Sequence, residues 1–305
     1  MDMLFVRDFN AFTGGHLKFL AYMNHTAASR LASPILYQTP RSRAVPGNIF
    51  NDYKGATIDD IRSFPAYFIA GDDWFILDEA GIDPGKAPVV NLVQGFRHAE
   101  PHNPLLACLA RPALRICVSP AVANAIRDHV NGEVVVIENG IEAGSMPPTP
   151  LLDSPARIMI AGLKNPTMAH EVATRLNGVV DIDLIVHQLP RERFLARMAQ
   201  ASICILLPVA AEGYFLPPLE AMALGRGVIT PECVGNLCYC EPEVNCLMPD
   251  YTADALAQAA KALVHDATRL CRLAMGGLKT AARRSIDAER AAYHAILARH
   301  IGASS

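Results

Sequence analysis

The feature that most constrains the fold is an alternation of short apolar segments with helical stretches, which is interrupted once. The interruption is Ala143–Pro155 (AGSMPPTPLLDSP), whose Pro, Gly and Ser residues follow no period and are typical of a linker. Strands separated by helices of this length indicate parallel, doubly wound sheets. We therefore expect an α/β protein with two halves, residues 1–145 and 146–280, and a C-terminal helical segment, 281–305, packing back on the first half.

Apolar runs and helix signals give the expected elements. Ser119-Pro120 is a strong helix start, because it places an N-cap residue directly before proline at the first helical position. Helices are also expected after Asp59 and Asp72. Further helices are expected at Met168–Leu176, Glu192–Ala199, Leu219–Leu224, Asp254–Val264 and Ala281–Arg299. The expected strands are Met3–Phe9, Pro34–Tyr37, Ala66–Ile69, Val89–Val93, Leu114–Val118, Val134–Ile137, Arg157–Ala161, Ile182–Val186, Ile203–Pro208 and Val228–Thr230.

Composition excludes several classes of protein. Apolar residues make up 51% of the 305 residues and charged residues 19%, which excludes a disordered chain. The net charge of −3 lacks the basic footprint of a nucleic-acid partner. Because no run of about 18 apolar residues is present, we expect at most peripheral membrane contact. The acidic start MDMLFVRDFN is unlike a secretion signal, so a cytoplasmic location is expected.

The eight cysteines divide into two groups. Four stand singly among apolar residues and are expected in the cores: Cys108, Cys117, Cys204 and Cys271. The other four cluster without the repeated ligand spacing of a zinc site: Cys233, Cys238, Cys240 and Cys246. We interpret them as free thiols in a reducing compartment, and no metal site is expected.

The segment between Pro208 and Leu219 is the strongest candidate for a site. It joins a strand to a helix at the carboxyl edge of a parallel sheet, where ligands bind. Backbone N–H groups around Phe215 and Leu216 and the helix dipole would suit a diphosphate. Glu212 and Glu220 then make sense as acceptors for sugar hydroxyls, although singly they also fit an exposed glutamate and a favourable first-turn acid.

The string EGYFLPPLEAMALGRGVIT resembles the signature of family 4 retaining glycosyltransferases, with two glutamates separated by seven residues. Around it, Cys233–Pro249, Val118-Ser119 and Ile137–Glu142 resemble further landmarks of that family, so the likeness covers about residues 115–265. It implies the GT-B fold, with two Rossmann-like domains whose parallel sheets face an interdomain cleft. It also implies retaining transfer of a sugar from a nucleotide-sugar donor. Asp73-Trp74 with the Val-Gln ending at Gln94 loosely resembles bacterial rhamnosyl and polysaccharide transferases.

The resemblance assigns a role to each matching residue. Glu220 would bind the ribose and Glu212 the donor sugar, while Lys164 would hold the phosphates and, with Glu212, serve catalysis. The family usually has a second basic residue near Lys164, which this sequence lacks, and Arg226 is a weaker candidate whose simpler interpretation is a solvent-facing side chain. The donor-binding residues so implied are Gly14, Gly15, Gly162, Lys164, Glu212, Gly213, Phe215, Leu216 and Glu220.

The first half offers a weaker site. Thr13-Gly14-Gly15-His16 follows the first strand, where the family has a Gly-Gly loop facing the donor phosphate. The acceptor candidates are His16, Gln94, Arg97 and His98. His16 is equally consistent with an exposed histidine, and Asp72-Asp73 with either acceptor hydroxyl binding or capping of the following helix.

Three alternatives stay open. A metal-dependent GT-A transferase needs a D-x-D element, but Asp181-Ile-Asp183 is expected at the start of a strand, away from a site. A nucleotide-sugar epimerase or hydrolase, or a non-catalytic sugar-nucleotide-binding module, would use the same scaffold. The favoured hypothesis is a glycosyltransferase of glycan, polysaccharide or glycoconjugate biosynthesis. Its partners would be a nucleotide-sugar donor and a glycan, lipid-linked or other hydroxyl acceptor, with no cofactor or metal, because helix N-termini and Lys164 supply the positive potential.

Overall fold

The computed structural model describes residues 1–53, 55, 64–83, 87–149 and 157–302. The chain divides into two compact units. Unit 1 comprises Met1–Asn139 and Glu289–Ser305, and unit 2 comprises Gly140–Ala288. The chain therefore passes from one unit to the other twice, after Asn139 and after Ala288.

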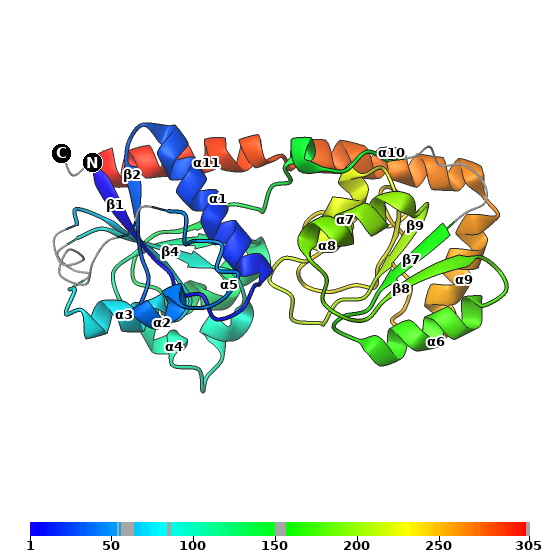
Figure 1. Cartoon of the computed structure of the whole chain (residues 1–305), viewed down its shortest axis with the longest axis horizontal. Helices are drawn as coiled ribbons and strands as arrows, with labels where there is room; N and C mark the ends of the chain where they lie inside the picture. The colour runs from blue at the N-terminus through cyan, green and yellow to red at the C-terminus, as the bar shows by residue number, and fades with distance from the viewer. Residues whose placement is uncertain (54, 56–63, 84–86, 150–156, 303–305) are drawn as a thin grey trace. The chain divides into compact units, whose positions relative to one another are not determined.

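Unit 1 is built on a six-stranded parallel sheet with the order β2-β1-β3-β4-β5-β6. Figure 1 labels β1, β2 and β4 of this sheet. Its central strands are buried over their whole length, as expected for a parallel sheet covered on both faces. The strands are β1 (Asp2–Val6), β2 (Ser33–Tyr37), β3 (Tyr67–Ala70), β4 (Val89–Val93), β5 (Leu114–Cys117) and β6 (Val134–Val136). The helices are α1 (Gly14–Ser29), α2 (Pro40–Arg43), α3 (Asp73–Glu79), α4 (Leu105–Cys108) and α5 (Pro120–Ile126), with the 3-10 turns η2 (Phe96–Ala99) and η3 (Arg127–His129).

Helix starts in unit 1 follow the local sequence signals. The Ser119 hydroxyl accepts the Val122 N–H (3.3 Å) and Pro120 is the first residue of α5, which confirms the predicted N-cap. Helix α3 begins after Asp72 as predicted, but the Asp72 side chain makes no capping hydrogen bond. The helix expected after Asp59 lies outside the described residues.

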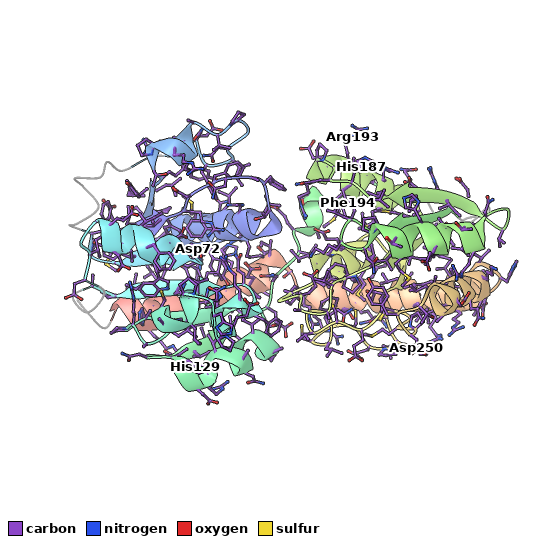
Figure 2. The ribbon with its side chains drawn as sticks, turned by 90° about the horizontal axis from the view of Figure 1, so that it is seen from below. Asp72, His129, His187, Arg193, Phe194 and Asp250 are labelled. Atoms are coloured by element: carbon purple, nitrogen blue, oxygen red, sulfur yellow. The ribbon has the colours of Figure 1, made fainter. Side chains whose placement is uncertain are left out.

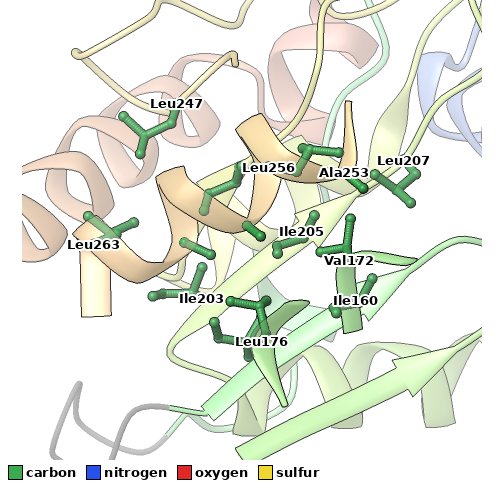
Figure 3. Packing of buried hydrophobic residues seen from close by; sticks show 14 of the residues in the cluster. Ile160, Val172, Leu176, Ile203, Ile205, Leu207, Leu247, Ala253, Leu256 and Leu263 are labelled. Atoms are coloured by element: carbon green, nitrogen blue, oxygen red, sulfur yellow. The ribbon is translucent and has the colours of Figure 1, made fainter. Parts of the chain in front are cut away.

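Unit 2 has a four-stranded parallel sheet with the order β10-β9-β7-β8. Alternate residues of β7 and β9 point to one face, where they pack against α6 and α9 in a hydrophobic core (Figure 3). The strands are β7 (Arg157–Ala161), β8 (Asp181–Ile185), β9 (Ile203–Leu206) and β10 (Gly227–Ile229). The helices are α6 (Pro166–Leu176), α7 (Arg191–Gln200), α8 (Leu216–Ala223), α9 (Ala253–Val264) and α10 (Ala267–Arg283), with the 3-10 turn η4 (Ala143–Ser145).

The C-terminal region differs from the expected single helix over Ala281–Arg299. Ala281 belongs to α10, which the sequence analysis did not predict, and a separate helix α11 (Ile286–Gly302) follows. From Glu289 onward α11 packs in unit 1 against α1, where Lys18 Nζ lies 2.6 Å from Glu289 Oε2 and the Thr26 and Tyr293 hydroxyls are 2.8 Å apart. None of the described helices combines the length and apolar character needed to span a bilayer.

Two smaller expectations also have an outcome. Cys271 is exposed on α10, so its predicted place in a core is wrong, whereas Cys108, Cys117 and Cys204 are buried as predicted. Within the expected linker, Ala143–Ser145 forms the turn η4, and residues 150–156 lie outside the described part of the chain.

Candidate functional site

The connection from β9 to α8 brings two predicted site residues of unit 2 into contact. Lys164, which follows β7, forms an ion pair with Glu212 Oε1, and this oxygen also accepts the Val209 N–H (3.4 Å). The Lys164 ammonium lies 5.8 Å from the centre of the Phe215 ring. The Lys164 side chain is 44% exposed, so an anionic ligand has access to its charge.

The start of α8 has fewer free N–H groups than expected. The Phe215 N–H donates to the Gly235 carbonyl (3.0 Å), which corrects its predicted availability to a diphosphate. Pro217 and Pro218 have no N–H, so of the four positions from the N-cap Phe215 to Pro218, Leu216 supplies the one remaining N–H donor. A Cβ at Gly235 would lie 2.7 Å from the backbone carbonyl oxygen of Glu212 and 2.9 Å from the backbone nitrogen of Phe215. Only glycine therefore allows the two backbone segments to approach this closely.

Glu220, the predicted ribose ligand, is held by a residue that the sequence analysis missed. Its side chain is 3% exposed, and Oε1 forms an ion pair with Arg191 Nη1. Arg191 is the first residue of α7, directly after Pro190, and its side chain is 37% exposed. The sequence predicts a helix start near Arg191, but it gives no signal that the Arg191 side chain contacts a glutamate 29 residues later in the chain.

Two of the predicted donor-binding glycines, Gly162 and Gly213, lie in packed parts of unit 2. Gly162 donates its N–H to the Ile185 carbonyl (2.9 Å), and a Cβ at Gly162 would collide with the Cβ of Ala169, so this glycine lets α6 approach β7. Gly213 is buried beside Glu212 in the loop before α8.

Arg226 and the D-x-D element are corrected by their burial. Arg226 is 5% exposed and donates to the Leu224 and Ala201 carbonyls (2.9 and 3.3 Å), so it is a structural residue and not a solvent-facing one. Asp183 lies on β8, as predicted, and its carboxylate pairs with Arg197, with Nε 2.9 Å from Oδ2. This aspartate is therefore engaged in an ion pair with Arg197.

The clustered cysteines contain two thiols whose protonated form is favoured. Burial raises the pKa of Cys233 to about 11, and burial together with the Cys246 thiol raises that of Cys240. Over the residues that the structure describes, no three His, Cys, Asp or Glu side chains gather as a set of metal ligands.

In unit 1, the Gly-Gly pair forms the first turn of α1 and not the loop that was expected. Gln94, after β4, donates from Nε2 to the Gly15 carbonyl (3.1 Å), while the surroundings of Gly14 are open. His16 is buried, and its ring nitrogens lie 2.8 Å from Thr13 Oγ1 and 3.3 Å from the Asp8 carbonyl. Burial, and then the charge of Arg7, lowers the pKa of His16 to about 4, so the ring is neutral. His16 is therefore not an exposed histidine.

The remaining acceptor candidates lie after β4. His98 is 2% exposed, its Nδ1 lies 3.2 Å from the Gly95 carbonyl, and burial lowers its pKa to about 4. His98 therefore lies inside unit 1, and its expected contact with an acceptor stays a prediction. Arg97 is exposed and pairs with Asp72 (3.3 Å). Asp73 is buried and accepts the Ala70 N–H (2.9 Å), and burial, opposed by Arg7, raises its pKa to about 6.

Comparison with known proteins agrees with this architecture. Residues 149–266 match the family model described as Glycosyl transferases group 1. A search of the curated proteins found no match. Among similar solved structures, HepE of Anabaena in complex with UDP-glucose has a TM-score of 0.77 at 13% identity, over 98% of this chain and 100% of that chain.

Two further structures span almost the whole chain. Sucrose-phosphate synthase from Thermosynechococcus elongatus has a TM-score of 0.72 at 14% identity and covers 100% of both chains. The lipopolysaccharide outer core galactosyltransferase WaaB, in its apo form, has a TM-score of 0.66 at 14% identity over 97% of this chain and 99% of that chain. The likeness establishes the fold, and the prediction of a GT-B protein with two parallel sheets is confirmed.

Proposed function

We propose that this chain, with its group 1 glycosyltransferase domain at residues 149–266, transfers a sugar from a nucleotide-sugar donor to a hydroxyl acceptor. The observation that carries the proposal is a double pairing at the carboxyl edge of the unit 2 sheet. Each predicted glutamate holds one cation, Glu212 with Lys164 and Glu220 with Arg191. HepE of Anabaena, which shares the fold, was solved with UDP-glucose, and this supports a uridine nucleotide as the first donor to test.

Each pair has a role in donor binding. Glu220 accepts hydrogen bonds from the ribose hydroxyls, and Arg191 compensates its buried charge. Lys164 and the Leu216 N–H stabilise the negative charge that grows on the departing diphosphate, and Glu212 accepts from the donor sugar. Arg191 also supplies the second cation that is missing from the sequence around Lys164. Arg193 and Phe194, labelled in Figure 2, follow it in the same helix.

The proposed reaction retains the configuration of the sugar. The acceptor oxygen bonds to the anomeric carbon on the face from which the diphosphate leaves, and the bond from that carbon to the diphosphate oxygen breaks. The acceptor proton passes to the leaving diphosphate oxygen, so the reaction requires no separate base. Lys164, Arg191 and the start of α8 supply positive potential without a metal ion. Such transfers build glycans, polysaccharides or glycoconjugates.

A nucleotide panel with two variants tests the site. We expect UDP to stabilise the protein against heat more than GDP, dTDP or CMP, because it binds the folded state selectively. Glu220→Ala should weaken UDP binding and Lys164→Ala should depress turnover. Glu171→Ala and Lys279→Ala, which remove exposed charges from α6 and α10, serve as matched controls. Wild-type donor binding and rate in both site variants would show that the site is wrongly assigned.

The acceptor separates transfer from the two alternatives on this scaffold. A transferase releases nucleotide slowly from the donor alone and much faster when the right acceptor is present. A hydrolase or epimerase turns the donor over at a rate that does not depend on the acceptor, and a binding module does not turn it over. Nucleotide release from UDP-glucose, measured with and without a panel of sugar acceptors, therefore decides among the three.

A further inference from the structure

The strand order of unit 1 singles out one position on its sheet. The chain runs from β1 to β2 on one side and then returns to β3 on the other side of β1. In open parallel sheets, ligands bind outside the carboxyl ends of the strands at such a switch point. The residues there are Arg7, directly after β1, and Gly71–Asp73, directly after β3.

Contacts among the described residues of unit 1 hold the Arg7 side chain in place but leave its Nε donor unused. Its Nη1 donates to the Ala70 carbonyl (3.0 Å) and lies 3.3 Å from Asp73 Oδ2. Its guanidinium carbon lies 5.7 Å from the centre of the Phe19 ring on α1. Its Nε is buried and has no hydrogen-bond partner within the described part of the chain. A buried donor without a partner is costly, so the site favours an oxygen ligand that would satisfy it.

A second guanidinium converges on the same position from the β4 side. Gly71 has φ +57, and a Cβ there would collide with Arg97 Nη2 and lie 3.7 Å from Arg7 Nη1. Both arginines therefore border one glycine that has no side chain to separate them. Arg97 is paired with Asp72, which Figure 2 labels, but the two side chains are 47% and 65% exposed. An ion pair this exposed contributes little, so Arg97 is available to another anion.

We propose that Arg7 and Arg97 form an oxyanion subsite beside Gly71, and that the acceptor carries a phosphate or carboxylate group that binds there. Guanidinium groups bind both kinds of oxyanion through paired, charge-assisted hydrogen bonds. Arg7 is the fixed half of the subsite, since Asp73 and Ala70 hold it. Arg97 is the adjustable half and exchanges Asp72 for the ligand. The assignment of the ligand to an acceptor rests on the proposed function, whereas the subsite itself does not.

Titration with inorganic phosphate and with acetate at constant ionic strength tests the subsite, read from 31P and 13C NMR of the two anions. Arg97→Ala should raise the phosphate Kd roughly tenfold, because a charge-assisted contact is lost. Asp72→Asn should lower that Kd, because it removes the competing carboxylate. Arg299→Ala, which removes an exposed arginine of α11, should leave the Kd unchanged. Arg7→Lys keeps the charge but loses Nε, and it should also weaken binding.

The outcomes separate the subsite from the proposed function. A phosphate Kd that is unchanged in Arg97→Ala, or raised in Asp72→Asn, overturns the subsite even if UDP binds and sugar transfer occurs. If UDP fails to bind but the phosphate Kd follows the expected pattern, the subsite stands and the proposed function falls. When transfer is observed, Arg97→Ala should raise KM for phosphorylated or carboxylated sugars about tenfold and leave neutral sugars unaffected. An equal rise for neutral sugars overturns the assignment of the acceptor.

Discussion

Removing Arg191 should destabilise unit 2 through the glutamate that it leaves behind. Arg191→Ala deprives the Glu220 carboxylate, which is 3% exposed, of its cation, whereas Arg191 itself is 37% exposed. Breaking a fully buried pair costs about 3–5 kcal/mol and breaking a surface pair about 0–1 kcal/mol. Because one partner is buried and the other half-exposed, we expect a loss of about 2 kcal/mol in the free energy of unfolding. For a unit of this size that lowers Tm by about 4–8 °C.

A double-mutant cycle isolates the cause of that loss. Glu220→Gln keeps the shape of the side chain and removes its charge, so in this background Arg191→Ala should cost less than about 0.5 kcal/mol. Urea unfolding of the four proteins, followed by circular dichroism, gives the coupling free energy. Arg193→Ala, an exposed arginine in the same turn of α7, is the matched control and should change stability by less than about 0.5 kcal/mol. Equal costs of Arg191→Ala in the two backgrounds would refute the argument from a buried carboxylate.

Two further predictions concern helix packing within a unit and the dependence of stability on pH. Gly162→Ala should lower the stability of unit 2 by about 2 kcal/mol because its Cβ meets the Cβ of Ala169, while Gly14→Ala, with open space around it in α1, should stabilise by about 0.5 kcal/mol. Thermal unfolding of both variants measures this, and shifts of the same sign would contradict it. The folded pKa of His16, about 4, lies below its unfolded value of 6.5, so its contribution is present at pH 7 and is lost as pH falls from about 6.5 to 4. Between pH 7 and pH 4, the free energy of unfolding should fall by up to about 3 kcal/mol more in the wild type than in His16→Gln, as measured by urea unfolding. An identical pH dependence in the two proteins would count against a buried neutral ring.

Local patterns were sufficient to predict most of the secondary structure. The ten strands within the described residues lie at the expected apolar runs, and the predicted N-cap at Ser119 is present, because the apolar pattern of a strand and the capping of a helix depend on residues close together in the chain. The neighbourhood of Lys164 and Glu212 also follows from local information. Each residue comes after one of two strands, β7 and β9, that pair in the sheet, and the carboxyl ends of parallel neighbours meet at one edge.

Tertiary contacts decided what the sequence patterns left open. Helix α10 contains Gly276 and Gly277, residues that disfavour a helix by propensity, yet a Cβ at Gly277 would lie 2.9 Å from Met222 Cγ, so close packing against α8 requires glycine there. The pairing of Arg191 with Glu220 and the burial of Arg226 likewise join residues that are remote in sequence or lack a periodic pattern. Amino-acid order specifies elements through interactions a few residues apart. Which charges become buried, and which partner compensates each one, depends on how those elements pack.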